Sequence, residues 1–146
     1  MTAFFNRFKI GLLPMYVLLV ILTSYVTSCS KDELEIQNDF PFEVKVMPIP
    51  KEVANGNTVE IRITIQPTGN YNNTQYYLRY FQFDGQGTLQ YYEEPSYLPN
   101  DLYQLPTKQF RLYYTSKSNV SQSFDIWISD NFGNEKQLSF EFNSSD

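Results

Sequence analysis

The chain contains no histidine, and its 146 residues include a single cysteine. Without histidine, a catalytic triad with an imidazole base is impossible, and the commonest side-chain ligand of metal ions is missing. One cysteine cannot form an intramolecular disulfide, so burial of side chains must hold the folded part together. Lysine and arginine are also scarce, eleven against sixteen acidic residues, and this balance leaves no basic patch for nucleic acid.

The first feature that is present is an N-terminal segment with the parts of a signal peptide in their usual order. Arg7 and Lys9 precede an uncharged stretch over residues 10–30, which is apolar at its start and hydroxylated toward its end. Near the end of the stretch stand Val26, Thr27, Ser28 and Cys29. This run resembles the bacterial lipobox, with an aliphatic residue, a tolerant position, a small residue and the cysteine that carries lipid.

This resemblance predicts a lipoprotein. A signal peptidase would cleave between Ser28 and Cys29, and the thiol of Cys29 would carry diacylglycerol, so that two or three acyl chains hold the protein on a membrane. The alternative is a single transmembrane anchor, because about 20 uncharged residues can cross a bilayer. The hydroxylated residues of the last third disfavour that alternative, because they are costly inside lipid.

The residues after the cysteine suggest where the lipoprotein is delivered. Residues 30–33 read Ser-Lys-Asp-Glu, with no aspartate next to Cys29, and this pattern resembles an address for the outer membrane. A lysine followed by two acidic residues also resembles a surface-export signal of some Gram-negative bacteria. The plain alternative is a solvated tether. We expect a protein of the cell envelope, lipid-anchored in the outer membrane and either periplasmic or exposed at the surface.

We expect three parts in the chain: a signal peptide (1–28), a lipidated N-terminus and tether (29–41), and one folded domain (42–146). The part after residue 28 has one domain's usual length. It keeps all sixteen acidic residues but only nine basic ones, for a net charge of −7, and it retains ten tyrosines, nine phenylalanines and one tryptophan. These aromatic residues supply a large core.

The hydrophobic period of this domain is two, which predicts strands with one buried and one wet face. The sequence predicts no helix after the signal peptide, and about seven strands. The predicted strands centre on residues 42–46, 58–65, 76–83, 88–92, 110–114, 124–128 and 138–142. The number of predicted strands and their spacing along the chain favour an all-β, immunoglobulin-like antiparallel β-sandwich. Residues 84–87 (Asp-Gly-Gln-Gly) predict a hairpin turn, and the proline-containing residues 93–108 predict a long crossover between sheets.

No combination of residues in the chain is typical of an active site. Glu93 and Glu94 are adjacent carboxylates, but neighbours on an extended chain point to opposite faces, so we interpret them as solvated loop residues. The oxygens of residues 130–135 could bind calcium, yet they lack the spacing of a calcium loop and fit a hairpin turn better. We therefore expect no enzyme, no metal, no cofactor and no small-molecule substrate.

One surface of the predicted sandwich has an unusual composition. The strand over residues 76–83 is apolar on both faces, and only one face can contact the core. Its outward residues would include Arg79 and Phe81, and the neighbouring strand over residues 123–129 would add Asp125 and Trp127. These four residues form a candidate binding patch of the types enriched in interface hot spots. The favoured alternative is that the tyrosine-rich crossover folds over this face and buries it.

Several segments together resemble one known family. They are residues 39–51 (DFPFEVKVMPIPK), 79–89 (RYFQFDGQGTL), 98–101 (LPND), 110–115 (FRLYYT) and 130–133 (DNFG). In this order they resemble the TraQ-type conjugal transfer proteins of conjugative transposons. The resemblance covers nearly all of the chain after the signal peptide, and it implies a small envelope lipoprotein, an accessory of a DNA-transfer apparatus.

Two functions remain open from the sequence. In the first, a lipid-anchored, non-catalytic module binds other proteins of the conjugation apparatus through a sheet edge or the candidate binding patch. The membrane is the second partner, through the lipid on Cys29. In the second, a surface lipoprotein binds carbohydrate through outward aromatic rings. Coplanar rings in a groove would favour sugar, whereas a flat patch or a free edge strand would favour protein.

Overall fold

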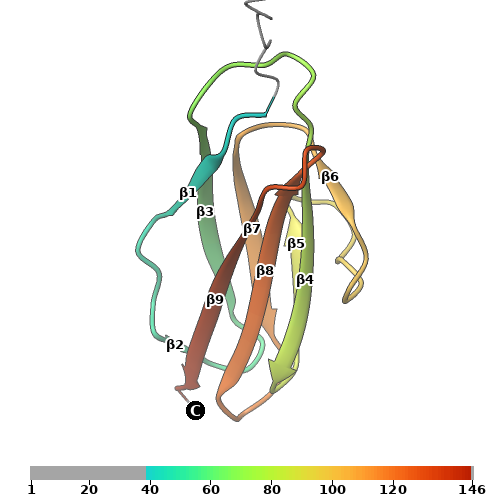
Figure 1. Cartoon of the computed structure of the whole chain (residues 1–146). Helices are drawn as coiled ribbons and strands as arrows, with labels where there is room; N and C mark the ends of the chain where they lie inside the picture. The colour runs from blue at the N-terminus through green and yellow to red at the C-terminus, as the bar shows by residue number, and fades with distance from the viewer. Residues whose placement is uncertain (1–38, 146) are drawn as a thin grey trace, which may run out of the picture. The chain divides into compact units, whose positions relative to one another are not determined.

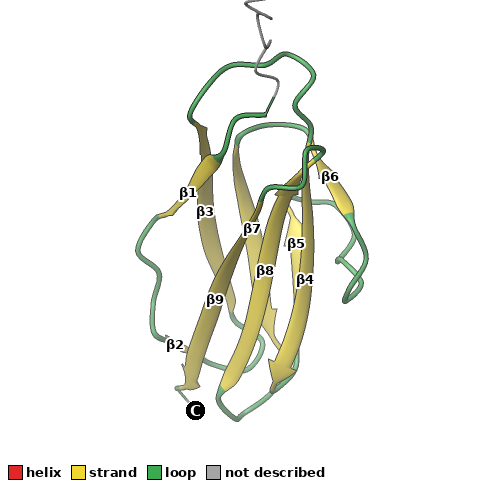
Figure 2. Cartoon of the chain, in the orientation of Figure 1, coloured by secondary structure: helices red, strands yellow, loops and turns green. Residues whose placement is uncertain are grey.

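The computed structural model describes residues 39–145, which form nine strands and no helix. The strands make two sheets packed face to face (Figures 1 and 2). Sheet I has the order β1-β3-β7-β5, from strands β1 (Phe42–Val46), β3 (Thr58–Pro67), β7 (Gln109–Ser116) and β5 (Gly87–Tyr91). Sheet II has the order β2-β9-β8-β4-β6, from strands β2 (Glu52–Val53), β9 (Glu135–Ser144), β8 (Gln122–Asp130), β4 (Tyr76–Asp84) and β6 (Tyr103–Leu105).

This topology confirms the predicted all-β sandwich. Seven longer strands have the two-sheet arrangement of an immunoglobulin constant-type domain, and the short strands β2 and β6 add to the edges of sheet II. All strand pairs are antiparallel except β2 and β9, where Glu52 lies opposite Asn143 in parallel register. In Figure 1 sheet II lies in front of sheet I.

Alternation along the strands explains why the sheets pack. The isoleucines of β3 at positions 61, 63 and 65 are buried, whereas the residues between them are half-buried or exposed. On β7 and β8 the same alternation brings Tyr114 onto Phe124, with ring centroids 4.4 Å apart across the two sheets. These contacts give the domain its core without a disulfide.

The hairpin predicted at residues 84–87 is wrong. β4 does not pair with β5: β4 lies in sheet II beside β8, whereas β5 pairs with β7 in sheet I. Gly85 adopts a φ of +68°, so the turn is real, but it carries the chain from one sheet to the other. At Gly87 the ring of Tyr114 occupies the space that a side chain would need, which brings the backbone of β5 close to the core.

The prediction that residues 93–108 cross from one sheet to the other is only partly right. The segment leaves sheet I after β5, but it returns to sheet I at β7. On the way it forms β6 at the edge of β4. Its backbone closes the open side of the sandwich: Tyr97 N donates to Leu89 O of β5 at 2.7 Å, and Asn100 N donates to Tyr80 O of β4 at 2.9 Å. The segment therefore joins the free edges of the two sheets.

Candidate functional site

The outward face of sheet II brings together Arg79 and Trp127. Arg79 on β4 lies directly opposite Trp127 on β8 in the antiparallel register. Its guanidinium lies over the indole, with Cζ 4.6 Å from the ring centroid. This is the geometry of a cation–π contact. Because the register of two long strands fixes both Cα positions, the pair is part of a rigid surface.

Phe81 and Phe83 extend this surface along β4. Their rings meet edge to face, with centroids 5.0 Å apart and an interplanar angle of 70°. A bulge between Gln82 and Asp84 turns this end of the strand. Gln82 follows the inward alternation of the strand and reaches the hydroxyl of Tyr114 at 2.9 Å, while Phe83 is 54% exposed.

Asp125 lies on the same face, opposite Phe81 in register. Its Oδ2 accepts a hydrogen bond from Nε2 of Gln137 on β9, so the carboxylate is held toward β9. Among the ion pairs of residues 39–145, none joins Asp125 to Arg79. The structure thus places Arg79, Phe81, Asp125 and Trp127 on one face, with the basic and the acidic group not paired with each other.

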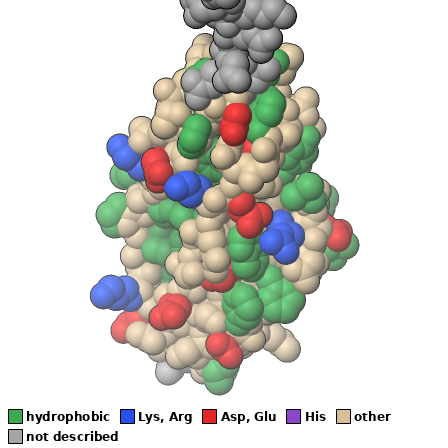
Figure 3. Space-filling model, viewed as in Figure 1, with side chains coloured by type: hydrophobic (Ala, Val, Ile, Leu, Met, Phe, Trp, Pro, Cys, Tyr) green, Lys and Arg blue, Asp and Glu red, His purple; other side chains and the backbone are tan. Residues whose placement is uncertain are grey.

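The tyrosine-rich crossover does not bury this face, contrary to the favoured expectation. It lies along the edge of β4, beyond β6 in Figure 1, and its Leu98 and Leu102 are themselves 63% and 60% exposed. Arg79, Phe81 and Trp127 are half-buried. Figure 3, which views sheet II from outside, shows apolar side chains gathered beside a basic group over β8 and β4. We call Arg79, Phe81, Phe83, Asp125 and Trp127 the aromatic patch.

The turn after β8 is a hairpin turn held by one carboxylate. Oδ1 of Asp130 accepts hydrogen bonds from the backbone amides of Phe132 and Asn134, both at 2.9 Å, and Oδ2 accepts one from the side chain of Asn134 at 2.8 Å. The oxygens of Asp130 are therefore occupied by protein donors. Within the described part of the chain, no cluster of acidic residues has the geometry of a metal site.

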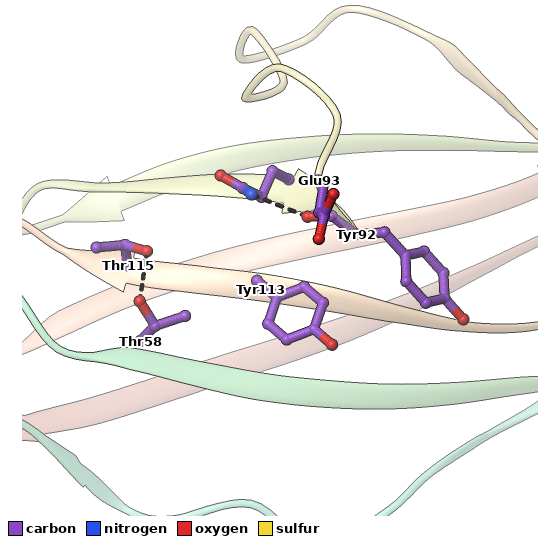
Figure 4. A pocket seen from close by; sticks show the side chains of 6 residues that line it. Thr58, Tyr92, Glu93, Tyr113 and Thr115 are labelled. Carbon is purple, nitrogen blue, oxygen red and sulfur yellow. Dashed lines mark hydrogen bonds between the residues drawn. The ribbon is translucent and has the colours of Figure 1, made fainter.

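The outward face of sheet I carries a feature that the sequence did not reveal. A shallow hollow of about 350 Å³ is lined by Thr58, Gln90, Tyr92, Glu93, Tyr113 and Thr115 (Figure 4). Tyr113 alternates outward on β7, which the period-two pattern could have shown. The approach of Tyr92 and Glu93 depends on the backbone after β5, where Tyr92 has a φ of +47°, and no sequence pattern predicts that conformation.

A charged group borders this hollow without lining it. Glu60 on β3 pairs with Arg62, and Arg111 on β7 approaches the same Oε1 at 3.6 Å. The hydrogen bond from Arg62 is the main reason why the pKa of Glu60 lies below its ordinary value. A side-chain hydrogen bond with Tyr113 and the charge of Glu60 raise the pKa of Arg111. Both arginines are thus engaged with groups of their own sheet.

Ser28 and Cys29, the predicted cleavage and lipidation residues, lie outside the residues that the structure describes. Across residues 39–145, no helix has the length and apolar character needed to span a bilayer.

The fold and this surface together define an immunoglobulin-like domain with an exposed aromatic and charged sheet face. The chain matches the model of the TraQ conjugal transfer protein family over residues 12–145, and it belongs to that family. No curated protein matches the chain significantly.

Solved structures agree with this assignment. The crystal structure of a conjugative transposon lipoprotein from Bacteroides eggerthii is 44% identical, with a TM-score of 0.68, and the match covers 72% of this chain and 99% of that chain. The solution structure of a lipoprotein from Bacteroides thetaiotaomicron is 46% identical, with a TM-score of 0.66, and the match covers 77% of this chain and 86% of that chain. The solution structure of a conjugate transposon protein from Bacteroides vulgatus is 48% identical, with a TM-score of 0.65, and the match covers 77% of this chain and 91% of that chain.

Proposed function

We propose that this protein is a lipid-anchored, non-catalytic docking module of a conjugative DNA-transfer apparatus, and that the aromatic patch on sheet II binds another protein of that apparatus. Family membership supports the link to conjugal transfer. The relatives from Bacteroides eggerthii and Bacteroides thetaiotaomicron are described as lipoproteins, which supports attachment through Cys29 to an envelope membrane.

The observation that carries the docking role is the Arg79–Trp127 pair on the outward face of sheet II, with Cζ 4.6 Å from the ring centroid. Tryptophan and arginine are the residues that most often dominate binding energy at interfaces. Burial under a partner would strengthen their contact, because a desolvated cation–π pair is worth more than an exposed one. The patch lies on the outward sides of adjacent strands, and an open sheet face of this kind suits a protein partner.

The same patch is a poor platform for a sugar. Stacking on a pyranose needs an open ring face, yet Phe81 and Phe83 meet edge to face at 70° and Arg79 covers one side of Trp127. The rings are not coplanar. This geometry favours the docking role over the carbohydrate-binding role for sheet II.

Mating assays test this proposal. In a donor whose chromosomal copy is deleted, transfer is measured after complementation with the wild-type chain, with Trp127→Ala, or with Lys45→Gln. The last variant removes an exposed charge on β1 of the opposite sheet. We expect the deletion and Trp127→Ala to lower transfer frequency at equal protein level, and Lys45→Gln to restore it. Full transfer by the deletion strain would overturn the link to conjugation, and full transfer by Trp127→Ala alone would overturn the role of the patch.

A further inference from the structure

We propose that the hollow on the outward face of sheet I is a second recognition site, which holds the guanidinium of an arginine side chain from a partner protein. The hollow is lined by Tyr92, Tyr113, Glu93, Gln90, Thr58 and Thr115. The inference uses the proposed function only in assuming a protein partner. It concerns the sheet opposite the aromatic patch, so either site can be wrong without the other.

Two tyrosine rings form walls of this hollow. Tyr113 projects from β7, and Tyr92 follows the last residue of β5; their ring centroids are 6.4 Å apart and their planes are inclined by 64°. Tyr91 supports Tyr92 from behind, edge to face, with centroids 4.7 Å apart. Faces of tyrosine rings attract cations through the ring quadrupole, and a planar guanidinium can stack on one ring while its edge approaches the other.

The backbone holds Tyr92 in this position at a cost. Its φ of +47° is in the left-handed region, where a bulky residue with a Cβ is sterically disfavoured. The ring gains little burial in return, because Tyr92 remains 41% exposed. The amide of Gln90 secures the conformation by donating to Tyr92 O at 2.8 Å. The strain therefore displays an aromatic ring at the surface, as is common at binding sites.

Glu93 supplies the negative charge that would pair with the bound guanidinium. Its carboxylate makes no hydrogen bond and no ion pair with any described residue, and it lines the hollow together with both rings (Figure 4). A carboxylate beside aromatic faces is the combination that binds a guanidinium through two parallel hydrogen bonds and stacking. The basic residues nearby do not fill this role, because Arg62 and Arg111 both pair with Glu60 and neither lines the hollow.

The remaining polar side chains explain why a cation fits better than a sugar. Thr58 and Thr115 share a hydrogen bond of 2.8 Å at the far end of the hollow, and the amide nitrogen of Gln90 is engaged with Tyr92 O. A sugar needs several donors and acceptors for its hydroxyl groups, and the two threonine hydroxyls and the amide nitrogen of Gln90 are already used within the protein. The carboxylate of Glu93 is the one charged group that lines the hollow, and a positively charged ligand would neutralise it. The chain as a whole is acidic, with a net charge of −5, and attracts basic partners.

Titration with small probes tests the site without knowledge of the partner. N-acetyl-arginine amide is added to the isotope-labelled full chain in a non-ionic detergent, and backbone amide shifts are followed by NMR. The neutral isostere N-acetyl-citrulline amide is the matched control ligand. We expect saturable shifts at Tyr92, Glu93 and Tyr113 with the arginine probe, with Kd on the order of millimolar, and at least about threefold weaker binding of citrulline.

Two variants identify the groups responsible. Glu93→Gln removes the charge that lines the hollow, whereas Glu94→Gln removes the neighbouring charge that does not; we expect the first to weaken binding of the arginine probe at least about threefold and the second to leave it unchanged. Tyr92→Asn removes the ring but tolerates a positive φ, and should also lose binding. Equal binding of the citrulline probe, undiminished binding by Glu93→Gln, or no saturable shift overturns the proposal. None of these outcomes affects the mating phenotype of Trp127→Ala.

Discussion

The hydroxyl of Tyr114 donates a hydrogen bond of 2.6 Å to Oε1 of Gln122, and both residues are fully buried between the two sheets. Gln122 in turn donates a hydrogen bond of 2.8 Å from Nε2 to Oγ of Ser116. Burial raises the pKa of Tyr114, and the hydrogen bond from Gln82 opposes that rise. Here polar groups in the core satisfy one another, which is the condition for burying them without a large loss of stability.

Two tyrosines of the core should respond to loss of the hydroxyl in opposite ways. Tyr114→Phe leaves Gln122 and Gln82 short of a partner and should lower the free energy of unfolding by about 1–3 kcal/mol. Tyr76 has a buried hydroxyl with no hydrogen-bond partner among the described residues. Tyr76→Phe should therefore be neutral or stabilising by up to about 1 kcal/mol. Urea denaturation of both variants measures the difference, and equal destabilisation would contradict the assignment of these networks.

The stability of the domain should fall in strongly alkaline solution. Burial raises the pKa of Tyr97 far above its ordinary value, with a smaller contribution from Glu94, and burial also raises the pKa of Tyr76 and Tyr80. The native state therefore keeps protons that the unfolded state loses. The contribution to stability is complete below about pH 10 and is lost as the pH rises toward the folded-state value.

The variant Tyr97→Phe isolates one of these groups. It removes a titrating hydroxyl but keeps the ring that stacks on Tyr103, with centroids 4.0 Å apart. We expect nearly unchanged stability at neutral pH and a shallower fall of unfolding free energy between about pH 10 and about pH 12. An identical alkaline slope in Tyr97→Phe and the wild type would show that Tyr97 is not the source of the effect.

Much of the fold could be predicted from the sequence because alternation is a local property. The isoleucines of β3 and the period of two along β7, β8 and β9 mark the buried faces of these strands without any knowledge of the sheet order. Pairing of β4 with β8 followed from the usual order of an immunoglobulin-like sandwich. The destination of the chain after Gly85 could not be predicted, because a glycine turn serves a hairpin and a crossing between sheets equally well.

The two candidate sites also differ in how much of each could be predicted from the sequence. Arg79, Phe81, Asp125 and Trp127 could be placed on one face from the period of two strands and their pairing. The hollow beside Tyr113 depends on a left-handed residue at Tyr92, and tyrosine is not a residue type that signals such a conformation. Without it Glu93 reads as an ordinary loop carboxylate. Tertiary backbone geometry, and not residue type, creates that site.

Truncation of Trp127 should cost little stability. The indole lies on the outward face and contacts Arg79, and an exposed cation–π pair contributes about 0.5–1 kcal/mol. We expect Trp127→Ala to lower the unfolding free energy by about 1 kcal/mol. The matched control is Ile126→Ala, the fully buried neighbour on the same strand, which should cost about 2–5 kcal/mol. A loss at Trp127 as large as that at Ile126 would mean that the aromatic patch is part of the core.

Lipid attachment should depend on Cys29 alone. Cys29→Ala removes the only thiol of the chain, so incorporation of a labelled fatty acid and recovery in the membrane fraction should both be lost. Thr27→Ala changes the tolerant position of the lipobox and should leave labelling intact. Persistent labelling of Cys29→Ala would rule out the lipoprotein interpretation, since no other residue of the chain can form the thioether.

The central claim, that the aromatic patch of sheet II docks onto a transfer protein, is tested most directly by photo-cross-linking in living donor cells. A photoreactive amino acid replaces Phe81 on the patch or, as control, Lys45 on β1 of the opposite sheet, so that Arg79 and Trp127 stay intact. We predict an adduct between position 81 and another protein encoded by the conjugative element, abolished by Trp127→Ala, and none from position 45. Absence of an adduct at position 81, or equal adducts from both positions, would contradict the claim.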